Sequence, residues 1–228
     1  MCYIVLKKME ERVKSIEKVL KEILNMPYYR NYQATSGKVH NTANHENAVE
    51  DILVANGYDK SRIEKVSKKE RDQLLGGDDS VLATMENNTY ISQPCGTHNS
   101  PDFIIKDERG RLFFKECKSV KGGTPMYNSG IPTPRYIYIL SSEKHNATTL
   151  FMGEDCLPPK AKALIENHIR KQRLEDQRLN NVLQSMTNHG ISYYTRPMIQ
   201  HKGSKTKTNY FLNDSRLLNE QNVFAHIR

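Results

Sequence analysis

The chain has 228 residues, of which 37% are hydrophobic and 26% charged, and its formal net charge at pH 7 is +8. This length suits one domain, or one domain with helical additions, and the composition excludes a disordered chain. The sequence has no run of about 18 apolar residues and no small-residue cleavage site near its start, so we expect a cytoplasmic protein without a membrane span. The four scattered cysteines form no C-x-x-C pair, which argues against a disulfide framework or a structural zinc site.

The positive charge is concentrated in two stretches that lack acidic residues. Residues 117–142 contain Lys118, Lys121 and Arg135 without any Asp or Glu, and residues 192–213 are likewise free of acidic side chains. Basic segments of this kind favour a polyanionic partner such as nucleic acid, because clustered Lys and Arg neutralise phosphates. A solvated basic surface would have the same composition, so charge alone leaves both interpretations open.

The N-terminal segment predicts a helix over residues 3–24, followed by a polar linker that begins near Pro27. The apolar side chains of this helix are spaced three and four apart and so form a stripe along one face: Leu6, Met9, Val13, Ile16, Leu20 and Ile23. We therefore divide the chain into residues 1–39, a helix and linker, and residues 40–228, the main domain. The stripe packs either on the chain's own domain or on a second subunit, which makes residues 1–39 a candidate dimerisation element.

The main domain predicts helices and short strands in an order typical of an α/β fold. Helical segments are expected at 41–58, 59–79 and 158–186. Strands are expected at 88–93, 102–106, 111–118, 135–140 and 191–199. The strand RYIYIL at 135–140 has no charge after its arginine, which favours a central position covered on both faces. The order predicts a mixed β-sheet flanked by helices, with an N-terminal helical extension.

The two strands at 102–106 and 111–118 carry charged residues at the open end of a predicted hairpin. A polar turn at residues 107–110 places Asp102 opposite about position 116. Side chains alternate between the faces of a strand, so Glu116 and Lys118 share one face and Cys117 points away. Two carboxylates and an ammonium group would then meet at one end of the hairpin. A cluster of cross-strand salt bridges on a solvated surface would use the same three residues.

These three side chains also have the chemistry of a phosphodiesterase site. Paired carboxylates repel each other unless a cation intervenes. Mg²⁺ suits such a pair, because it binds one or two carboxylates and fills its other positions with water and substrate phosphate. A neighbouring lysine can orient the attacking water and stabilise the charge that grows on phosphorus. Asp102, Glu116 and Lys118 are therefore the candidate catalytic residues.

The arrangement of these motifs resembles a known enzyme superfamily. Asp102 directly after Pro101, and Glu116-Cys117-Lys118 after an apolar run, stand in the positions of the PD-(D/E)xK nuclease motif. The resemblance covers residues 40 to 196. Within the superfamily, the runs QPCGTHNSPDFII, ECKSVKGGTPMYNSGIP and YIYILSS are similar to type II restriction endonucleases, in particular the subgroup that cuts GANTC sites.

The resemblance implies an Mg²⁺-dependent enzyme that hydrolyses phosphodiester bonds in double-stranded DNA at a short palindromic site. It implies that Asp102, Glu116 and the main-chain carbonyl of Cys117 bind the metal. Family members often take a further acidic residue from the helix before the sheet, and Glu46 is the candidate here, with Glu50 behind it. The residues expected to bind DNA come from the basic stretches and from the loop after residue 118: Lys121, Asn128, Arg135, Arg196, Lys202, Lys205 and Lys207.

Side-chain geometry suggests which of these residues read bases. An amide pairs with adenine and a guanidinium with guanine, so Asn128 is the candidate adenine reader and Arg135 the candidate guanine reader. The lysines are expected to contact phosphates.

Several partners and alternatives follow from the resemblance. A homodimer is expected, since a symmetric pair of active sites cuts both strands of a two-fold site. A companion DNA methyltransferase in a bacterial or archaeal cytoplasm is also implied. Two other functions stay open: a structure-selective nuclease such as a Holliday-junction resolvase, and a non-catalytic DNA-binding protein.

Overall fold

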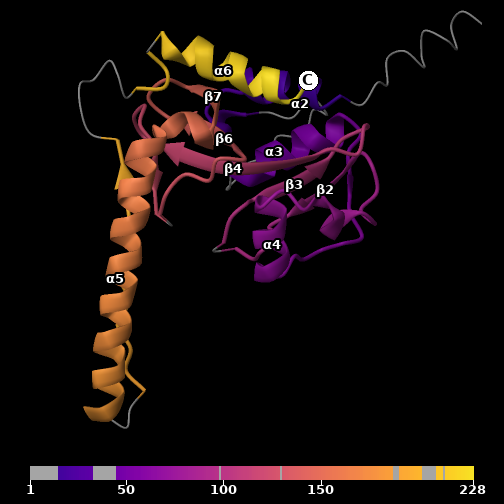
Figure 1. The fold of residues 1–228 in the computed structure, drawn as a ribbon. Coiled ribbons are helices and arrows are strands. Elements are labelled where there is room, and N and C mark those ends of the chain that lie inside the picture. Colours follow the sequence, from indigo (N-terminus) through magenta and orange to yellow (C-terminus); the bar gives the residue numbers. More distant parts are fainter. Residues whose placement is uncertain are drawn as a thin grey trace, which may run out of the picture.

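A six-stranded mixed β-sheet flanked by helices forms the centre of the molecule, as the sequence predicts (Figure 1). The computed structural model describes residues 15–32, 45–97, 99–128, 130–186, 190–201, 209–212 and 214–228. The strand order is β1-β2-β3-β4-β6-β7, and a separate two-stranded sheet pairs β5 with β8. Each helix in the described ranges is too short or too polar to cross a lipid bilayer.

The sheet combines parallel and antiparallel pairs. β4 and β6 run parallel, as do β1 and β2, whereas the β2–β3, β3–β4 and β6–β7 pairs are antiparallel. The strands are β1 (Asp59–Lys60), β2 (Thr89–Ser92), β3 (Phe103–Lys106), β4 (Leu112–Val120), β5 (Met126–Tyr127), β6 (Tyr136–Ser142), β7 (Ala147–Met152) and β8 (Ile199–Gln200). The α-helices are α2 (Ile16–Leu24), α3 (His45–Ala55), α4 (Lys68–Leu75), α5 (Pro159–Met186) and α6 (Ser215–His226), with 3₁₀ turns η1 (Tyr29–Asn31), η2 (Asp79–Leu82) and η3 (Gly153–Cys156).

A separate hydrophobic cluster covers each face of the sheet. On one face, α2, α3 and α6 pack against alternate strand residues such as Phe113 and Ile137. On the other face, α4, η2 and the β5–β8 pair cover Phe114, Tyr138 and their neighbours. All seven residues of β6 are buried, which confirms the predicted central strand. A strand between two apolar layers needs no polar alternation, and this explains the uncharged run in its sequence.

The β3–β4 hairpin has the predicted register. Phe103 pairs with Lys115, so position 102 lies opposite position 116. The turn is closed by Asp107, whose carboxylate accepts hydrogen bonds from the N–H groups of Arg109 and Arg111 at 2.9 and 2.8 Å. Gly110 follows with φ of 78°, a left-handed conformation that suits glycine.

The described part of the N-terminal helix packs on the chain's own domain, which is one of the two alternatives that its apolar stripe left open. Ile16, Leu20 and Ile23 are at most 2% exposed and lie in the cluster formed with α3 and the sheet. They are therefore occupied within the chain and do not form a free surface for a second subunit. Leu6, Met9 and Val13 lie outside the described residues.

Three expectations differ from the structure. The charged segment 59–79 is helical only over α4, which Ser67 and Glu70 begin with a reciprocal capping box. The segment 191–199 is irregular except for its last residue, which begins β8. No predicted element corresponds to β7 or to α6, and these two elements pack against each other at the edge of the sheet (Figure 1). Polar residues interrupt the apolar pattern of both elements, because their buried Thr149 and Glu220 bond each other at 2.8 Å.

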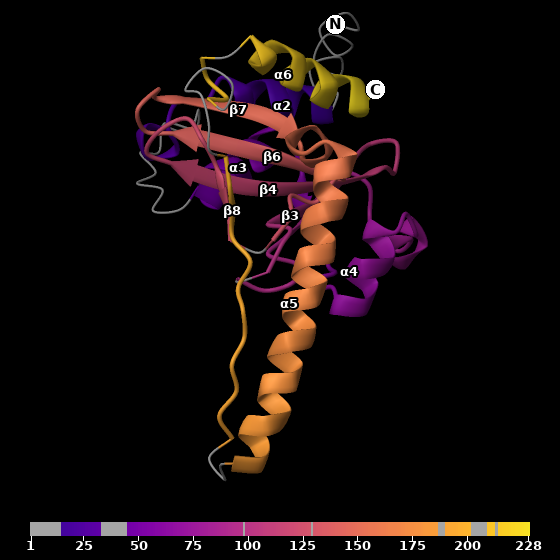
Figure 2. The same ribbon diagram turned by 60° about the vertical axis from the view of Figure 1, so that its left-hand side comes forward.

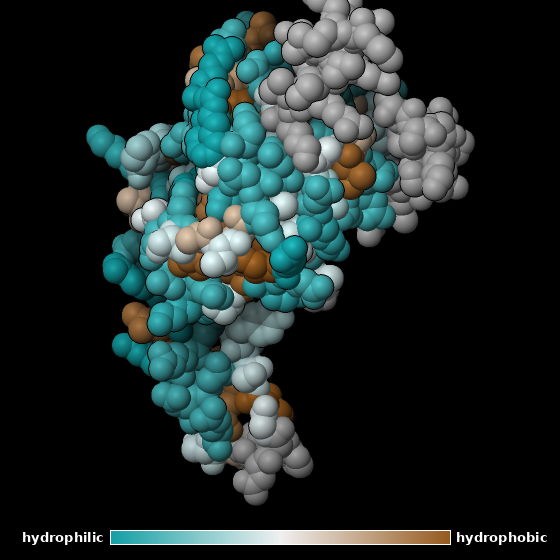
Figure 3. Space-filling model, turned by 90° about the vertical axis from the view of Figure 1, so that its right-hand side faces the viewer, coloured by the Kyte–Doolittle hydropathy of each residue, from teal (hydrophilic) through white to brown (hydrophobic). Residues whose placement is uncertain are grey.

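Helix α5 projects from the domain as an arm, and residues 190–198 return along it (Figure 2). Asp176 ties the two segments by accepting from the N–H and hydroxyl of Thr195, and Asn180 exchanges two hydrogen bonds with the backbone of Tyr193. No residue of α5 is buried. Figure 3 shows that this side of the molecule is mostly hydrophilic, with a small hydrophobic group near the tip of the arm.

Candidate active site

Asp102, Glu116 and Lys118 meet at the open end of the β3–β4 hairpin. The N–H of Asp102 donates to the Lys115 carbonyl at 3.0 Å, which continues the strand pairing one residue beyond β3. The N–H of Cys117 donates to Asp102 Oδ2 at 2.7 Å, so the backbone of β4 fixes this carboxylate. Lys118 Nζ forms an ion pair with Glu116 Oε1 at 2.7 Å. The hairpin register therefore brings all three predicted catalytic residues into one site.

The strand alternation also separates Cys117 from this cluster as predicted. Its thiol is buried in the hydrophobic cluster on the α2 and α3 face, whereas Glu116 and Lys118 line a cleft on the opposite face with Tyr127 and Tyr138.

The site holds its carboxylates in an environment that disfavours their charge. Burial raises the pKa of Asp102 to about 7, and the neighbouring Glu116 adds to the increase. Burial likewise raises the pKa of Glu116, although the Lys118 ammonium partly offsets that effect. Glu116 Oε2 is buried and has no hydrogen-bond partner in the part of the chain that the structure describes. An orphaned carboxylate oxygen beside a second carboxylate is a site that a cation would stabilise.

Glu46 contributes to this electrostatic environment from the first turn of α3. Its charge raises the pKa of Asp102 and of Glu116, so it lies close enough to repel both. Glu50 has a different partner, because the Tyr90 hydroxyl donates to its Oε1 at 2.8 Å. Of the two acidic residues expected from this helix, Glu46 therefore acts on the site through its charge, and Glu50 is bonded to the sheet.

The donor set fits a hard divalent cation that keeps much of its water. No group of three or more His, Cys, Asp and Glu side chains arranged to hold a metal ion occurs among the described residues. Mg²⁺ does not need such a cage, since it is commonly held by one or two carboxylates with waters and substrate phosphates in the other positions. Asp102, Glu116 and the Cys117 carbonyl could supply that partial set, with Glu46 at its edge.

Gln93 is a site residue that sequence reasoning missed. Its Nε2 donates to Asp102 Oδ1 at 3.2 Å, and its backbone N–H donates to the Asp102 carbonyl at 2.7 Å. Gln93 follows β2 and adopts a φ of 49°, which turns the chain toward Asp102. The only signal in the sequence was its place in the run QPCGTHNSPDFII, because a polar residue after a strand has many possible uses.

The polar loop after β4 lies beside the candidate catalytic residues. Asn128, Gly130, Ile131 and Thr133 line the same cleft as Glu116 and Lys118. The carbonyl of Asn128 accepts from Arg196 Nε at 2.7 Å, so two predicted DNA-binding residues from distant segments meet at this loop. Lys121 is exposed just past the end of β4.

Arg135 has intramolecular partners that the base-reading interpretation did not foresee. Its guanidinium donates to the Leu74 carbonyl, forms an ion pair with Asp79 at 3.2 Å and lies over the Phe114 ring. These contacts join the residue that precedes β6 to α4 and η2, and they favour a structural role. Lys202, Lys205 and Lys207 lie outside the described residues.

Comparison with known proteins adds no further identification, since no family model, no curated protein and no solved structure matches the chain.

Proposed function

We propose that this protein is a type II restriction endonuclease that hydrolyses phosphodiester bonds in double-stranded DNA at a short palindromic site, with Mg²⁺ as cofactor. The observation that carries the proposal is the meeting of Asp102 and Glu116 at one end of the hairpin, with Lys118 paired to Glu116. The +8 net charge supports a polyanionic substrate. The resemblance to the PD-(D/E)xK superfamily supports the same reaction.

In this proposal the chain's own residues position the reactants. Bound Mg²⁺ would supply Lewis-acid stabilisation of the phosphate and a more acidic water. Asp102 and Glu116 would hold it, and the Cys117 N–H keeps Asp102 in place. The Lys118 ammonium would orient the attacking water and stabilise negative charge on the phosphorus-bound oxygens. The oxygen of the attacking water would bond to phosphorus as the water releases a proton to solvent. The bond from phosphorus to the 3′ oxygen would break and that oxygen would take a proton from solvent, which leaves a 5′-phosphate and a 3′-hydroxyl.

We also propose a homodimer, because two symmetric active sites cut both strands of a palindrome. A companion methyltransferase would protect the host DNA in a bacterial or archaeal cytoplasm. Sedimentation of the 26.3 kDa chain with and without cleavable DNA tests the dimer. A strictly monomeric protein that cuts both strands in one encounter would contradict it.

Digestion of plasmid DNA with Mg²⁺, followed by sequencing of the ends, tests the function. We expect defined ends from the wild type, and losses of at least about 100-fold in cleavage for Asp102→Asn, Glu116→Gln and Lys118→Met, since each change removes transition-state stabilisation. Duplex binding should persist in all three, and the exposed carboxylate change Glu64→Gln should leave cleavage unaltered. Retained cleavage in any two of the site variants would refute the assignment, and cleavage confined to branched DNA would favour a junction resolvase.

A further inference from the structure

A second, larger pocket adjoins the candidate active site. It has a volume of about 740 Å³ and lies between α4 and the α5 arm. Ser100 and Thr133 line both this pocket and the cleft that contains Glu116 and Lys118, so the two spaces are contiguous. Ser100 is two residues before Asp102 in the sequence, and its hydroxyl accepts a hydrogen bond from the Tyr136 hydroxyl at 3.4 Å. A ligand in the pocket would therefore lie next to the scissile bond.

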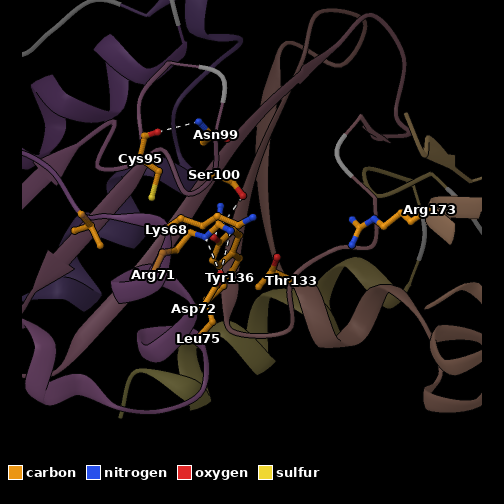
Figure 4. Close-up of a pocket in the computed structure, with 11 residues that line it drawn as sticks. Lys68, Arg71, Asp72, Leu75, Cys95, Asn99, Ser100, Thr133, Tyr136 and Arg173 are labelled. Carbon is orange, nitrogen blue, oxygen red and sulfur yellow. Dashed lines mark hydrogen bonds and ion pairs between the residues drawn. The ribbon is translucent and has the colours of Figure 1, made fainter. Parts of the chain in front are cut away.

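Cationic side chains face each other across this pocket. Lys68 and Arg71 reach it from α4, and Figure 4 shows Arg173 pointing toward it from the opposite side. Arg71 is paired with Asp72 at 3.0 Å, which also lines the pocket. No ion pair links Lys68 or Arg173 to a carboxylate in the described ranges, so these two charges are available to an anion. Three cationic side chains and one carboxylate therefore line the pocket, which gives its lining a net positive charge.

The residues that line the pocket suit a nucleotide chain better than a small anion. Val66, Leu75 and the buried Tyr136 give an apolar floor, while Asn99, Ser100 and Thr133 offer neutral hydrogen-bonding groups. A volume in the range of ordinary ligand pockets is far larger than one phosphate needs. Cations on opposite walls with neutral polar groups between them match a phosphodiester strand that passes through.

We infer that this pocket holds the DNA strand next to the bond that is cut, with Lys68 and Arg173 neutralising its phosphates from opposite walls. The inference rests on the proposed nuclease function for the position of that bond. It assigns a substrate-binding role to α4 and to the middle of the α5 arm, two elements that carry none of the candidate catalytic residues.

The dependence of DNA affinity on salt tests this role. Binding is measured with EDTA present, on a duplex that the wild type cleaves or on random-sequence duplex if it cleaves none. We expect Lys68→Ala and Arg173→Ala each to lower the slope of log affinity against log salt by about 0.9, and the double variant by about twice that, because each lost phosphate contact releases one counterion fewer. The matched variants Lys69→Ala and Arg170→Ala change exposed neighbours on the same helices that do not line the pocket, and their slopes should equal that of the wild type.

Replacing single phosphates of the DNA by neutral linkages then shows which phosphate lies beside Arg173. A methylphosphonate placed at successive positions beside the mapped cut should weaken binding of the wild type and of Arg170→Ala at one or two adjacent positions of the cut strand. At those positions the methylphosphonate should cause no further loss of affinity in Arg173→Ala, because the phosphate charge that it removes has already lost its partner, the Arg173 guanidinium. Unchanged slopes in the pocket variants, or equal losses in the matched variants, would overturn the inference. If the protein cuts DNA but the pocket variants keep the wild-type salt slope, the role of the pocket is refuted and the nuclease function stands. If the pocket variants show the expected smaller slopes but the protein does not cut DNA, the nuclease function is refuted and the role of the pocket in DNA binding stands.

Discussion

The protonation of Asp102 gives the metal-free protein a pH dependence that can be measured. Burial and Glu116 raise the pKa of this carboxyl from 3.8 to about 7, so the folded state binds the proton more tightly than the unfolded state does. The free energy of unfolding should therefore fall as the pH rises from about 4 to about 7, by up to about 4 kcal/mol. The comparison is between wild type and Asp102→Asn in EDTA, by urea denaturation at successive pH values.

Two controls accompany this prediction. Asp59→Asn alters an exposed carboxylate and should keep the wild-type pH dependence. Mg²⁺ added at pH 8 should raise the unfolding midpoint of the wild type but not of Asp102→Asn, because a ligand that binds only the folded state stabilises it. Parallel pH curves for wild type and Asp102→Asn would show that this carboxyl titrates normally in the folded protein.

Individual residues of the site differed in how far the sequence could predict them. Asp102 and Glu116 could be paired because a hairpin register counts outward from its turn, and a polar turn closed by Gly110 fixed that count. The contact of Gln93 with Asp102 could not be predicted, because it depends on the direction in which the chain leaves β2. Arg135 was assigned a base-reading role from its residue type, but its partners Leu74 and Asp79 come from elements distant in the sequence.

At the scale of elements, α2 should behave as part of the core. Leu20 is fully buried between α3 and the sheet, and Leu20→Ala should lower the free energy of unfolding by about 2–5 kcal/mol, through lost burial and the cavity left behind. Lys18→Ala on the exposed face of the same helix should change it by less than about 0.5 kcal/mol. Urea denaturation of both variants provides the measurement, and a small effect of Leu20→Ala would mean that α2 does not pack as described.

Gly153 packs closely against the loop that lines the candidate active-site cleft. A Cβ at this position would clash with the Thr133 carbonyl oxygen, and the Thr133 N–H donates to the Tyr138 hydroxyl at 3.0 Å. Gly153→Ala should therefore cost about 1–3 kcal/mol of stability and also reduce cleavage, because Thr133 must move. Gly122→Ala is the matched control, since a Cβ there meets nothing within 4 Å. Thermal unfolding and plasmid digestion of both variants distinguish a displaced loop from general destabilisation.

The elements that the sequence predicted were those with a simple periodicity. The strands β2, β3, β4 and β6 were expected within two residues of their observed ends, because apolar and β-branched runs between polar turns are a strong signal. β7 and α6 were missed because their buried polar pair interrupts that signal. The sequence could not decide whether the stripe of residues 16–24 packs on the chain itself or on a second subunit, because an amphipathic stripe does not say which surface covers it.

At the scale of the whole molecule, the arm should be dispensable for folding. No residue of α5 is buried, and the hydrogen bonds of Asp176 and Asn180 join it to its own return segment. Replacement of residues 164–195 by a flexible Gly/Ser linker of about 20 residues should shift the unfolding midpoint by no more than about 2–4 °C, since a change of loop length costs little. The same variant should bind duplex DNA with a smaller salt slope, because it lacks Arg173. Loss of cooperative unfolding would show that the arm stabilises the domain.

The parallel pairing of β4 and β6 has a consequence for how such a protein can change. Parallel neighbouring strands need a long connection, and here residues 121–135 connect the end of β4 to the start of β6. That connection begins just after Lys118 and supplies Asn128, Ile131 and Thr133 to the cleft around Glu116. The topology thus places a connecting segment beside the candidate catalytic residues. Substitutions at positions 128 and 131 would alter what fits against Glu116 and Lys118 while the six strands of the central sheet keep their neighbours.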